Sequence, residues 1–362
     1  MQFMDITAMQ ALGALLTSLA VCAAMGPVLI PALHKLKFGQ SIREVGPASH
    51  MKKSGTPTMG GIMLLTGLLV AMVIWNRFTP LLLMAFVLTF GHALIGFLDD
   101  YIKIVKKRNL GLTAKQKFAL QIALALAYIY YVNQHMGSAG TQLWIPGTAV
   151  SLQLGYLYYV LVLLLLVGTT NAVNLTDGLD GLVSFVSLPV MATYAFVAWQ
   201  AGEGELCLFA MAVLGSCLGF LVWNHYPAKV FMGDTGSLAL GGAVASLALL
   251  THTELLLVFV GGLYVCEALS VILQVFYFRH TGGKRIFRMT PIHHHFELGG
   301  WQETKVVAIF TLVSCIFCLA GLGLWCAGKG GSPSGNGVWR RYQRPWRGDG
   351  TGSAGKTGFF IR

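Results

Sequence analysis

The chain has 362 residues, of which 55% are hydrophobic and 11% are charged, whereas an average globular protein is about 25% charged. This composition, with a mean hydropathy of +0.67, excludes an ordinary soluble domain and indicates a protein that lies mostly within a membrane. The net charge of +11 could indicate a nucleic-acid partner, so its distribution along the chain has to decide between that partner and a membrane.

Apolar stretches of roughly 15–25 residues follow one another along the chain, and this is the length that a helix needs to cross a hydrocarbon core about 30 Å thick. Their length, without strand-like alternation, predicts helices rather than a β-barrel. The stretch at 236–251 is short and rich in Gly. We predict an all-α, polytopic integral membrane protein with about ten transmembrane helices, near residues 7–33, 58–76, 80–98, 117–133, 154–173, 182–200, 206–223, 236–251, 255–278 and 305–327.

The basic residues alternate between the two sides of these predicted spans. By position, 17 of the 25 Lys and Arg follow odd-numbered spans, Arg77 alone follows an even-numbered span, and seven lie in the C-terminal tail. The positive-inside rule then places the odd-numbered loops in the cytoplasm and both termini outside. The charge therefore indicates membrane topology and no nucleic-acid partner, and we expect a multi-pass membrane protein.

Two adjacent carboxylates, Asp99 and Asp100, end the third predicted span. Negative charge at a helix C-terminus opposes the helix dipole, so the pair needs a compensating partner. A local salt bridge to Lys103 is one explanation. A magnesium ion or a role as general base is the other, since hard cations take oxygen ligands. Basic residues that follow, Lys115 among them, form a field suited to phosphates and lipid headgroups.

The stretch GTTNAVNLTDGLDGL separates the fifth and sixth spans and carries Asn171, Asn174, Asp177 and Asp180. Carboxylates next to hydrocarbon are costly, which favours a functional role. Asn, Thr and Asp are also good helix caps, so a structural role stays open. On a helix, the residues at 174, 177 and 180 would share a face.

The loop after the seventh span contains Gly-Asp234-Thr-Gly-Ser237, which places one carboxylate on a flexible backbone. Such a carboxylate is suited to bind a metal beside phosphates. Phe231 either stacks on a base or packs against lipid.

The ninth span contains Glu267, with Ser270 and Gln274 on roughly the same side, and we interpret this carboxylate as structural. The span is followed by three consecutive histidines, His293–His295. They cannot all face one point on a helix, and zinc sites use other spacings, so phosphate contacts suit the run better. Together with five carboxylates at span ends, these residues are expected to converge on one membrane face.

Five stretches carry a resemblance to a known family: SGTPTMGG, DDYIK, NAVNLTDGLDGL, WNHYPAKVFMGDTGSLALGG and RIFRMTPIHHHFE. They resemble the motifs of the phospho-N-acetylmuramoyl-pentapeptide transferases, a branch of the polyprenyl-phosphate N-acetylhexosamine-1-phosphate transferases, over roughly residues 20–325. The resemblance implies a bacterial membrane enzyme that transfers phospho-MurNAc-pentapeptide from its UDP conjugate to undecaprenyl phosphate. The products would be UMP and lipid I, a peptidoglycan precursor. The resemblance also implies Mg²⁺ as cofactor and suggests a homodimer.

The same resemblance implies roles for individual residues. Asp234 is expected to ligate Mg²⁺, and Asp99, with Asp100 beside it, to deprotonate the lipid phosphate. Asp177, Asn174 and the histidines His293, His294 and His295 are expected to complete the centre. The remaining candidates for substrate binding are Lys53, Thr58, Lys115, Asn171, Asp180, Asn224, Phe231 and Ser237.

Two questions stay open at this level. The lipid phosphate either attacks the donor directly, which we favour, or an Asp attacks first and forms a covalent intermediate. The alternative function in the same superfamily is a sibling transferase that uses a UDP-N-acetylhexosamine. A secondary transporter would be expected to show internal repeats, and we find none.

The composition changes after the tenth span to Gly, Ser, Arg and Trp. We expect a catalytic transmembrane domain at 1–327 and a disordered tail at 328–362. The tail contains GTGSAGKT, which fits the phosphate-loop pattern but lacks the strand and helix that this motif requires. The seven Cys all lie in predicted spans and are expected to be small buried hydrophobic residues.

Overall fold

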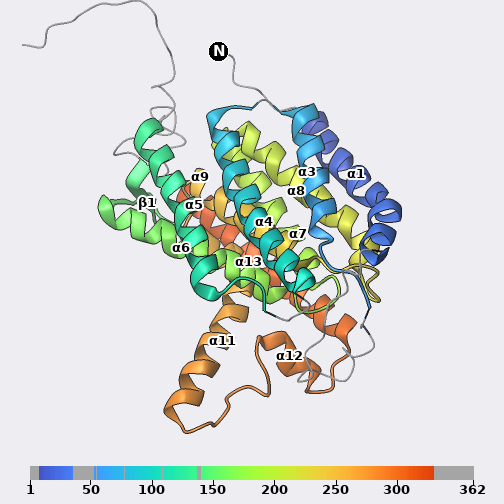
Figure 1. The fold of residues 1–362 in the computed structure, drawn as a ribbon. Coiled ribbons are helices and arrows are strands. Elements are labelled where there is room, and N and C mark those ends of the chain that lie inside the picture. Colours follow the sequence, from blue (N-terminus) through green and yellow to red (C-terminus); the bar gives the residue numbers. More distant parts are fainter. Residues whose placement is uncertain are drawn as a thin grey trace, which may run out of the picture.

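A computed structural model describes residues 8–35, 53, 55–76, 78–106, 110–136 and 140–329, and it is mostly helical (Figure 1). Apart from its first two residues, the predicted tail lies outside the described residues. The helices are α1 (Ala8–Lys35), α3 (Gly61–Trp75), α4 (Pro80–Val105), α5 (Ala114–His135), α6 (Tyr156–Thr176), α7 (Leu182–Ala201), α8 (Gly204–Asn224), α9 (Gly233–Leu250), α10 (Leu256–Val260), α11 (Gly262–His280), α12 (Ile292–Glu297) and α13 (Glu303–Lys329).

Every predicted apolar stretch overlaps a helix, as expected of an all-α polytopic membrane protein. Within the described ranges, eight helices are long and apolar enough to cross a membrane. Helix α3 has 15 residues and is shorter, and α5 contains lysines in its first turn, which lower its hydropathy. The ninth predicted stretch is divided at Gly261 into the short α10 and the long α11.

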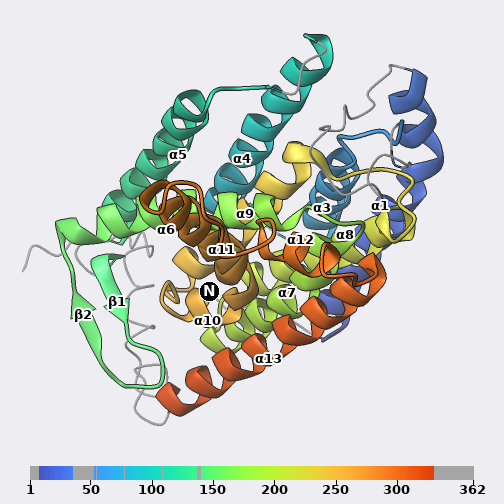
Figure 2. The same ribbon diagram turned by 90° about the horizontal axis from the view of Figure 1, so that it is seen from below.

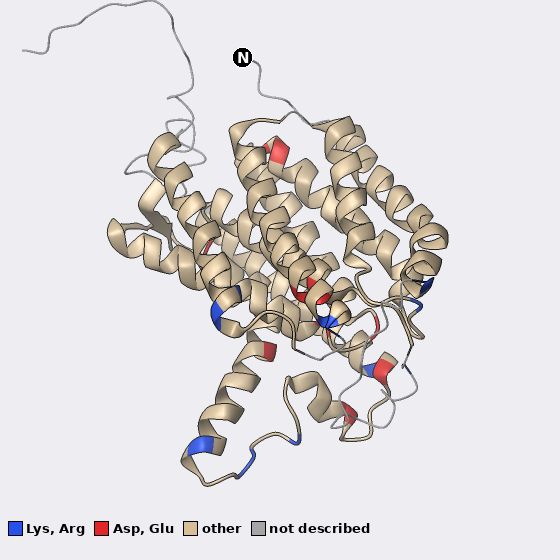
Figure 3. Ribbon diagram, in the orientation of Figure 1, with Lys and Arg blue, Asp and Glu red and all other residues tan. Residues whose placement is uncertain are grey.

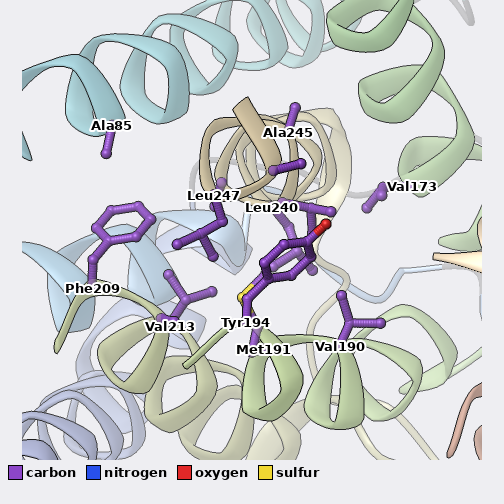
Figure 4. Packing of buried hydrophobic residues seen from close by; sticks show 14 of the residues in the cluster. Ala85, Val173, Val190, Met191, Tyr194, Phe209, Val213, Leu240, Ala245 and Leu247 are labelled. Carbon is purple, nitrogen blue, oxygen red and sulfur yellow. The ribbon is translucent and has the colours of Figure 1, made fainter. Parts of the chain in front are cut away.

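Helix α9 lies at the centre of the bundle and is buried along its whole length after its first turn. It packs mainly against α4 and α6, and it also contacts α3, α7 and α8. Figure 4 shows Leu240 and Leu247 of α9 among side chains of the surrounding helices, including Tyr194 of α7 and Phe209 of α8. The helices that pack against α9 therefore share one apolar core with it among the described residues.

The small residues of α9 explain both its central place and its weak hydropathy. A β-carbon at Gly241 would lie 2.6 Å from Cα of Thr170 in α6, and one at Gly242 would lie 2.8 Å from the backbone oxygen of Leu88 in α4. Close approach of helix backbones requires small residues, and dispersion contacts then hold the helices together in a membrane. Glycine lowers the hydropathy of this stretch, which is why it is the weakest of the predicted spans. The same glycines allow other helices to pack closely around α9.

Charged residues gather at one end of the bundle, where α4, α6 and α8 end and α9 begins (Figure 3). At the opposite end a two-stranded antiparallel hairpin, β1 (Gln142–Trp144) and β2 (Ser151–Gln153), lies beside the end of α13 (Figure 2). Trp144 contacts Trp325 of α13 edge to face, with ring centroids 5.5 Å apart. The hairpin is therefore remote from the charged end.

Helix α11 projects from the charged end of the bundle, and α12 returns beside it (Figure 1). The outer face of α11 exposes large apolar side chains such as Leu269, Ile272 and Phe276, whereas Glu267, Ser270 and Gln274 are buried on the other face. This arrangement confirms the predicted shared side of these three polar residues. All seven Cys are free; four of them are buried, while Cys266 and Cys326 are exposed and Cys315 is intermediate.

We predict that Gly241→Val prevents normal folding, because the new side chain would overlap the backbone of α6 at Thr170. Overpacking a core costs about 1–3 kcal/mol, and overlap with backbone is at the upper end of that range or beyond it. Thermal unfolding in detergent measures the effect. It is monitored by a fluorogenic reagent that reacts with the buried thiol of Cys217 once the protein unfolds. Gly323→Val is the control, because a β-carbon at Gly323 would have no heavy atom of another residue within 4 Å. Equal stability of the two variants would contradict the packing described for α9.

Candidate active site

Three carboxylates meet where the end of α4 reaches the start of α9. Asp99 and Asp100 of α4 are buried, Asp234 of α9 is partly exposed, and one oxygen of each lies within 4.8 Å of the others. Gly96 makes this approach possible, because a β-carbon there would lie only 2.0 Å from the backbone oxygen of Asp234. The two elements that sequence analysis selected separately thus form one acidic centre.

Asp100 binds the N-terminus of α9. Its Oδ2 accepts hydrogen bonds from the backbone N–H (2.9 Å) and the hydroxyl (2.7 Å) of Thr235, and its Oδ1 accepts one from the backbone N–H of Asp234 (3.2 Å). Helix α9 has no side-chain cap of its own, so Asp100 supplies the missing acceptor from another helix. The favourable end of the α9 dipole offsets the unfavourable position of Asp100 near the end of α4.

Gly233 adopts a φ of +72°, which side chains other than Gly rarely tolerate. A β-carbon at this position would also lie 2.7 Å from both Oδ2 of Asp100 and Oγ1 of the buried Thr58. Glycine is therefore required both by the turn into α9 and by the close approach of these two side chains. Thr58 consequently lies beside the acidic centre, and its role in substrate binding stays a prediction.

Two lysines neutralise the acidic centre. Nζ of Lys103 lies 2.6 Å from Asp99 and 3.2 Å from Asp234, and Nζ of Lys117 lies 3.1 Å from Asp99 and 2.8 Å from Asp234. A second constraint on Asp99 is the backbone N–H of Leu112, which donates to its Oδ1 at 2.7 Å. The local salt bridge considered for Lys103 is therefore present, but it belongs to a larger network that also includes α9.

The polar stretch at the end of α6 contributes Asn174 to the centre and places Asp177 near it. Nδ2 of Asn174 donates to Oδ1 of Asp234 (3.0 Å) and to the hydroxyl of the buried Ser237 (2.8 Å). Burial, and then the negative charges of Asp234, Asp100 and Asp180, raise the pKa of Asp177 to about 8. Burial and these neighbouring charges therefore both disfavour the ionised form of the Asp177 carboxyl.

A second ionic group joins three loops next to this centre. Nζ of Lys53 lies 2.7 Å from Asp180 and 2.6 Å from Glu303, and the backbone N–H of Asp180 donates to the same Glu303 oxygen at 2.6 Å. The other oxygen of Asp180 accepts from the backbone N–H of Ala228 at 2.9 Å. Burial lowers the pKa of Lys53, but the two carboxylates outweigh it and raise the pKa above its usual value.

Asn224 and Phe231 hold neighbouring loops in place through their hydrogen bonds. The buried side chain of Asn224 accepts from the backbone N–H of Gly181 (3.1 Å) and donates to the backbone oxygen of Val230 (2.9 Å). The backbone of Phe231 pairs with Pro57 and Gly60, at 2.8 Å each. Asn224 therefore fixes the 177–181 and 225–232 loops relative to each other, and its own side chain is buried.

The three histidines have three different partners, as their spacing predicts. His293 is fully buried, and its Nδ1 lies 3.1 Å from both carboxylate oxygens of Glu267. His294 contacts Glu297 at 2.8 Å, and Nδ1 of His295 accepts from the backbone N–H of Arg288 at 3.1 Å. The ring of His293 lies against Gly178, next to Asp177.

Two candidates lie away from the acidic centre. Lys115 is exposed in the first turn of α5, two residues before Lys117. Asn171 is exposed on α6, where its side chain donates to the backbone oxygen of Val167 at 2.8 Å. Neither residue takes part in the contacts of the three carboxylates.

Lys103, Lys117 and Glu303 are site residues that were not predicted from the sequence. The spacing of Lys103 from Asp99 indicated a salt bridge, and this was the only local signal. Lys117 lies in the basic stretch that also carries Lys115, and the sequence does not distinguish the two lysines. Glu303 reaches the site from a helix start that is distant in sequence, so the pattern along the chain gave no sign of its role. Thr113 caps α5 and, with Gln116, forms a capping box that fixes the start of the helix that carries Lys117.

The acidic centre has the donor chemistry of a hard divalent cation site. Three carboxylates from two helices present oxygens to one point, and Mg²⁺ is commonly bound by one or two carboxylates together with substrate phosphates. Lys103 and Lys117 already contact two of these carboxylates, so the centre combines metal-ligand oxygens with cations that suit anionic substrates.

The sequence matches two profiles that agree with this geometry. The profile Glycosyl transferase family 4 matches residues 82–252, and the phospho-N-acetylmuramoyl-pentapeptide-transferase signature 1 matches residues 53–65. The first contains Asp99, Asp100 and Asp234, and the second contains Lys53 and Thr58.

Full-length relatives decide the family. The phospho-N-acetylmuramoyl-pentapeptide-transferase of Shouchella clausii is 52% identical over 86% of this chain and 97% of its own length. The chain belongs to the phospho-N-acetylmuramoyl-pentapeptide transferase family. The enzymes of the same name from Bacillus subtilis (50% identical, 85% of this chain and 95% of the relative) and a Geobacillus species (51%, 85% and 96%) agree. The chain is therefore an enzyme that transfers a phosphosugar, and these relatives do not favour the sibling transferase.

Lys117→Met is predicted to lower the rate of phosphosugar transfer on the order of 100-fold, the usual loss when one group that stabilises developing charge is removed. The loss follows from its contacts with Asp99 and Asp234. Lys115→Met is the matched control and should stay within about twofold of wild type, because Lys115 is exposed outside the network. Initial rates at saturating substrate measure both variants. Similar losses in the two variants would mean that the general positive field matters, and not the specific contacts of Lys117.

Asp100→Ala should destabilise the protein by about 1–2 kcal/mol, the usual effect of removing a helix N-cap, because α9 loses its acceptor. Thermal unfolding in detergent gives the change as a lower Tm. Thr235→Val keeps the backbone N–H donors and removes one hydroxyl, so its loss should be smaller. A Thr235→Val protein that is less stable than Asp100→Ala would contradict the capping role of Asp100.

Proposed function

We propose that this chain transfers phospho-MurNAc-pentapeptide from UDP-MurNAc-pentapeptide to undecaprenyl phosphate, giving lipid I and UMP. The observation that carries the proposal is the acidic centre of Asp99, Asp100 and Asp234 with its two lysines, in a chain that covers 97% of a relative with that activity in its name. The centre lies at the end of a bundle of apolar helices, where a soluble donor and a membrane lipid can both reach it.

The proposal includes the topology. About ten helical segments cross the bacterial plasma membrane, namely the eight long apolar helices together with α3 and α5. The termini lie outside, and the centre faces the cytoplasm. The distribution of Lys and Arg between odd- and even-numbered loops supports this orientation. The domain division into a catalytic region at 1–327 and a tail at 328–362 belongs to the same proposal, as does a homodimer.

The reaction joins two anions, so the site must offset their repulsion. An oxygen of the lipid phosphate attacks the phosphorus that bears the sugar, a new P–O bond forms, and the bond to the bridging oxygen breaks as UMP leaves with the electron pair. Lys103 and Lys117 place positive charge beside Asp234, where it can stabilise the negative charge that develops in the transition state. Asp99 accepts any proton left on the lipid phosphate, which makes direct attack possible without a covalent step.

The centre is proposed to hold Mg²⁺, with Asp234 as its main ligand. Asp234 is the most exposed of the three carboxylates, whereas both oxygens of Asp100 are occupied by the start of α9. When bound, the cation would neutralise phosphate charge during transfer. Asn174 and Ser237 keep Asp234 oriented, and Lys53, Asp180 and Phe231 border the space for the nucleotide.

UMP release in detergent micelles tests the proposal, with UDP-MurNAc-pentapeptide and undecaprenyl phosphate as substrates. Wild type should release UMP only with Mg²⁺, and Asp234→Ala should fall to background, since it loses the proposed metal ligand. Release by wild type from UDP-N-acetylglucosamine, without release from the pentapeptide donor, would overturn the proposed donor. Magnesium-independent release would overturn the proposed cofactor.

A further inference from the structure

Helices α11 and α12, with the segment between them, form an arm that projects from the bundle. The buried face of α11 forms a polar seam that binds the chain as it returns along this arm. Gln274 accepts hydrogen bonds from the backbone N–H groups of Ile286 and Phe287, at 3.0 Å each, and donates to the backbone oxygen of Phe287. About two helical turns nearer the bundle, the carboxylate of Glu267 accepts a hydrogen bond from Nδ1 of His293. The seam therefore guides the chain from the arm back to the acidic centre.

Glu267 and His293 are both completely buried, with side-chain exposures of 0%. A buried carboxylate is costly unless it is paired, and an apolar pair of similar volume often gives equal or better stability. Stability alone therefore does not explain why Glu267 lies in the mostly apolar first part of α11. Hydrogen bonds to both carboxylate oxygens fix the plane and the direction of the imidazole ring.

The other ring nitrogen of His293 lies against the 177–181 turn. Nε2 has no hydrogen-bond partner among the described residues, although it is buried. It abuts Gly178, where a β-carbon would lie only 2.2 Å from it. Gly178 follows Asp177 in the turn that also presents Asp180. A buried, unpartnered nitrogen next to this turn has one use that its surroundings support, which is contact with a bound polar ligand.

We propose that Glu267 is a positioning residue of the transfer reaction: it orients His293 so that Nε2 faces the 177–181 turn and the phosphosugar bound there. Because Nδ1–H donates to Glu267, the ring cannot rotate or exchange the roles of its two nitrogens without losing this bond. Carboxylates that orient a metal-binding histidine in this way change affinity or activity by about 10–100-fold, and we expect an effect of the same order here. The inference rests on the proposed function only for the identity of the ligand.

A double-mutant cycle on the transfer rate tests the proposal. Glu267→Leu should lower kcat about 10–100-fold with the donor KM changed by less than about threefold, and Glu267→Gln should lose less, because its amide oxygen still accepts Nδ1–H. His293→Asn keeps a donor for Glu267 but removes Nε2, so it should lose as much activity as His293→Ala. The double variant Glu267→Leu/His293→Ala should be no slower than His293→Ala.

The opposite results would overturn the proposal. Losses that multiply in the double variant would mean that Glu267 acts independently of His293, and a wild-type rate in Glu267→Leu would mean that it has no role in transfer. Glu254→Gln is the matched control. Glu254 is also a buried carboxylate hydrogen-bonded to a side chain, Tyr158 at 2.5 Å, but it follows the far end of α9, so its rate should match wild type.

A measurement without substrate separates this inference from the proposed donor. In protein with ¹⁵N-labelled histidine, the signal absent from His293→Asn identifies His293, and its chemical shifts should report a protonated Nδ1. Glu267→Gln, which is expected to fold, should alter these shifts, whereas Glu254→Gln should not. Unchanged His293 shifts in Glu267→Gln would refute the positioning role even if the enzyme used a different donor.

Discussion

The contact between the end of α4 and the start of α9 is the constraint on which the site depends. Asp100 supplies the acceptors that the first turn of α9 lacks, and this fixes the backbone of Asp234 beside the end of α4. Gly96 and Gly233 keep the space between the two helices free of side chains. Because a buried charge in a membrane requires a partner, the same contact also determines where Lys103 and Lys117 must lie.

The rest of the site is held by polar contacts between loops that are distant in sequence. Lys53 connects Asp180 with Glu303, and Asn224 connects the 177–181 turn with the loop before α9. Buried ionic contacts of this kind give little net stability, but they favour one arrangement over others, because a displaced loop would leave an unpaired charge. The apolar helices thus provide the stability, and the charged end provides the geometry.

The arm of α11 and α12 extends the same principle. Its outer face is apolar and suits lipid, while its inner face uses Glu267 and Gln274 to bind the returning chain. A single histidine, His293, then reaches the turn beside Asp177. His294 and His295 have partners of their own within the arm. The run of three histidines therefore has one member against the 177–181 turn and two that stabilise the segment around it.

The sequence by itself determined the membrane class, the positions of the long helices and most of the acidic centre, because hydrophobic length and isolated carboxylates are local signals that survive without a fold. Five motifs also carried the resemblance that the relatives at about 50% identity then confirmed. Only the tertiary structure decided that Lys117 enters the centre while Lys115 is exposed, that Asp100 caps α9, and that Glu267 binds His293. These outcomes depend on which residues of separate helices come into contact. The spacing of residues within one segment of the chain contains no information about contacts with another segment.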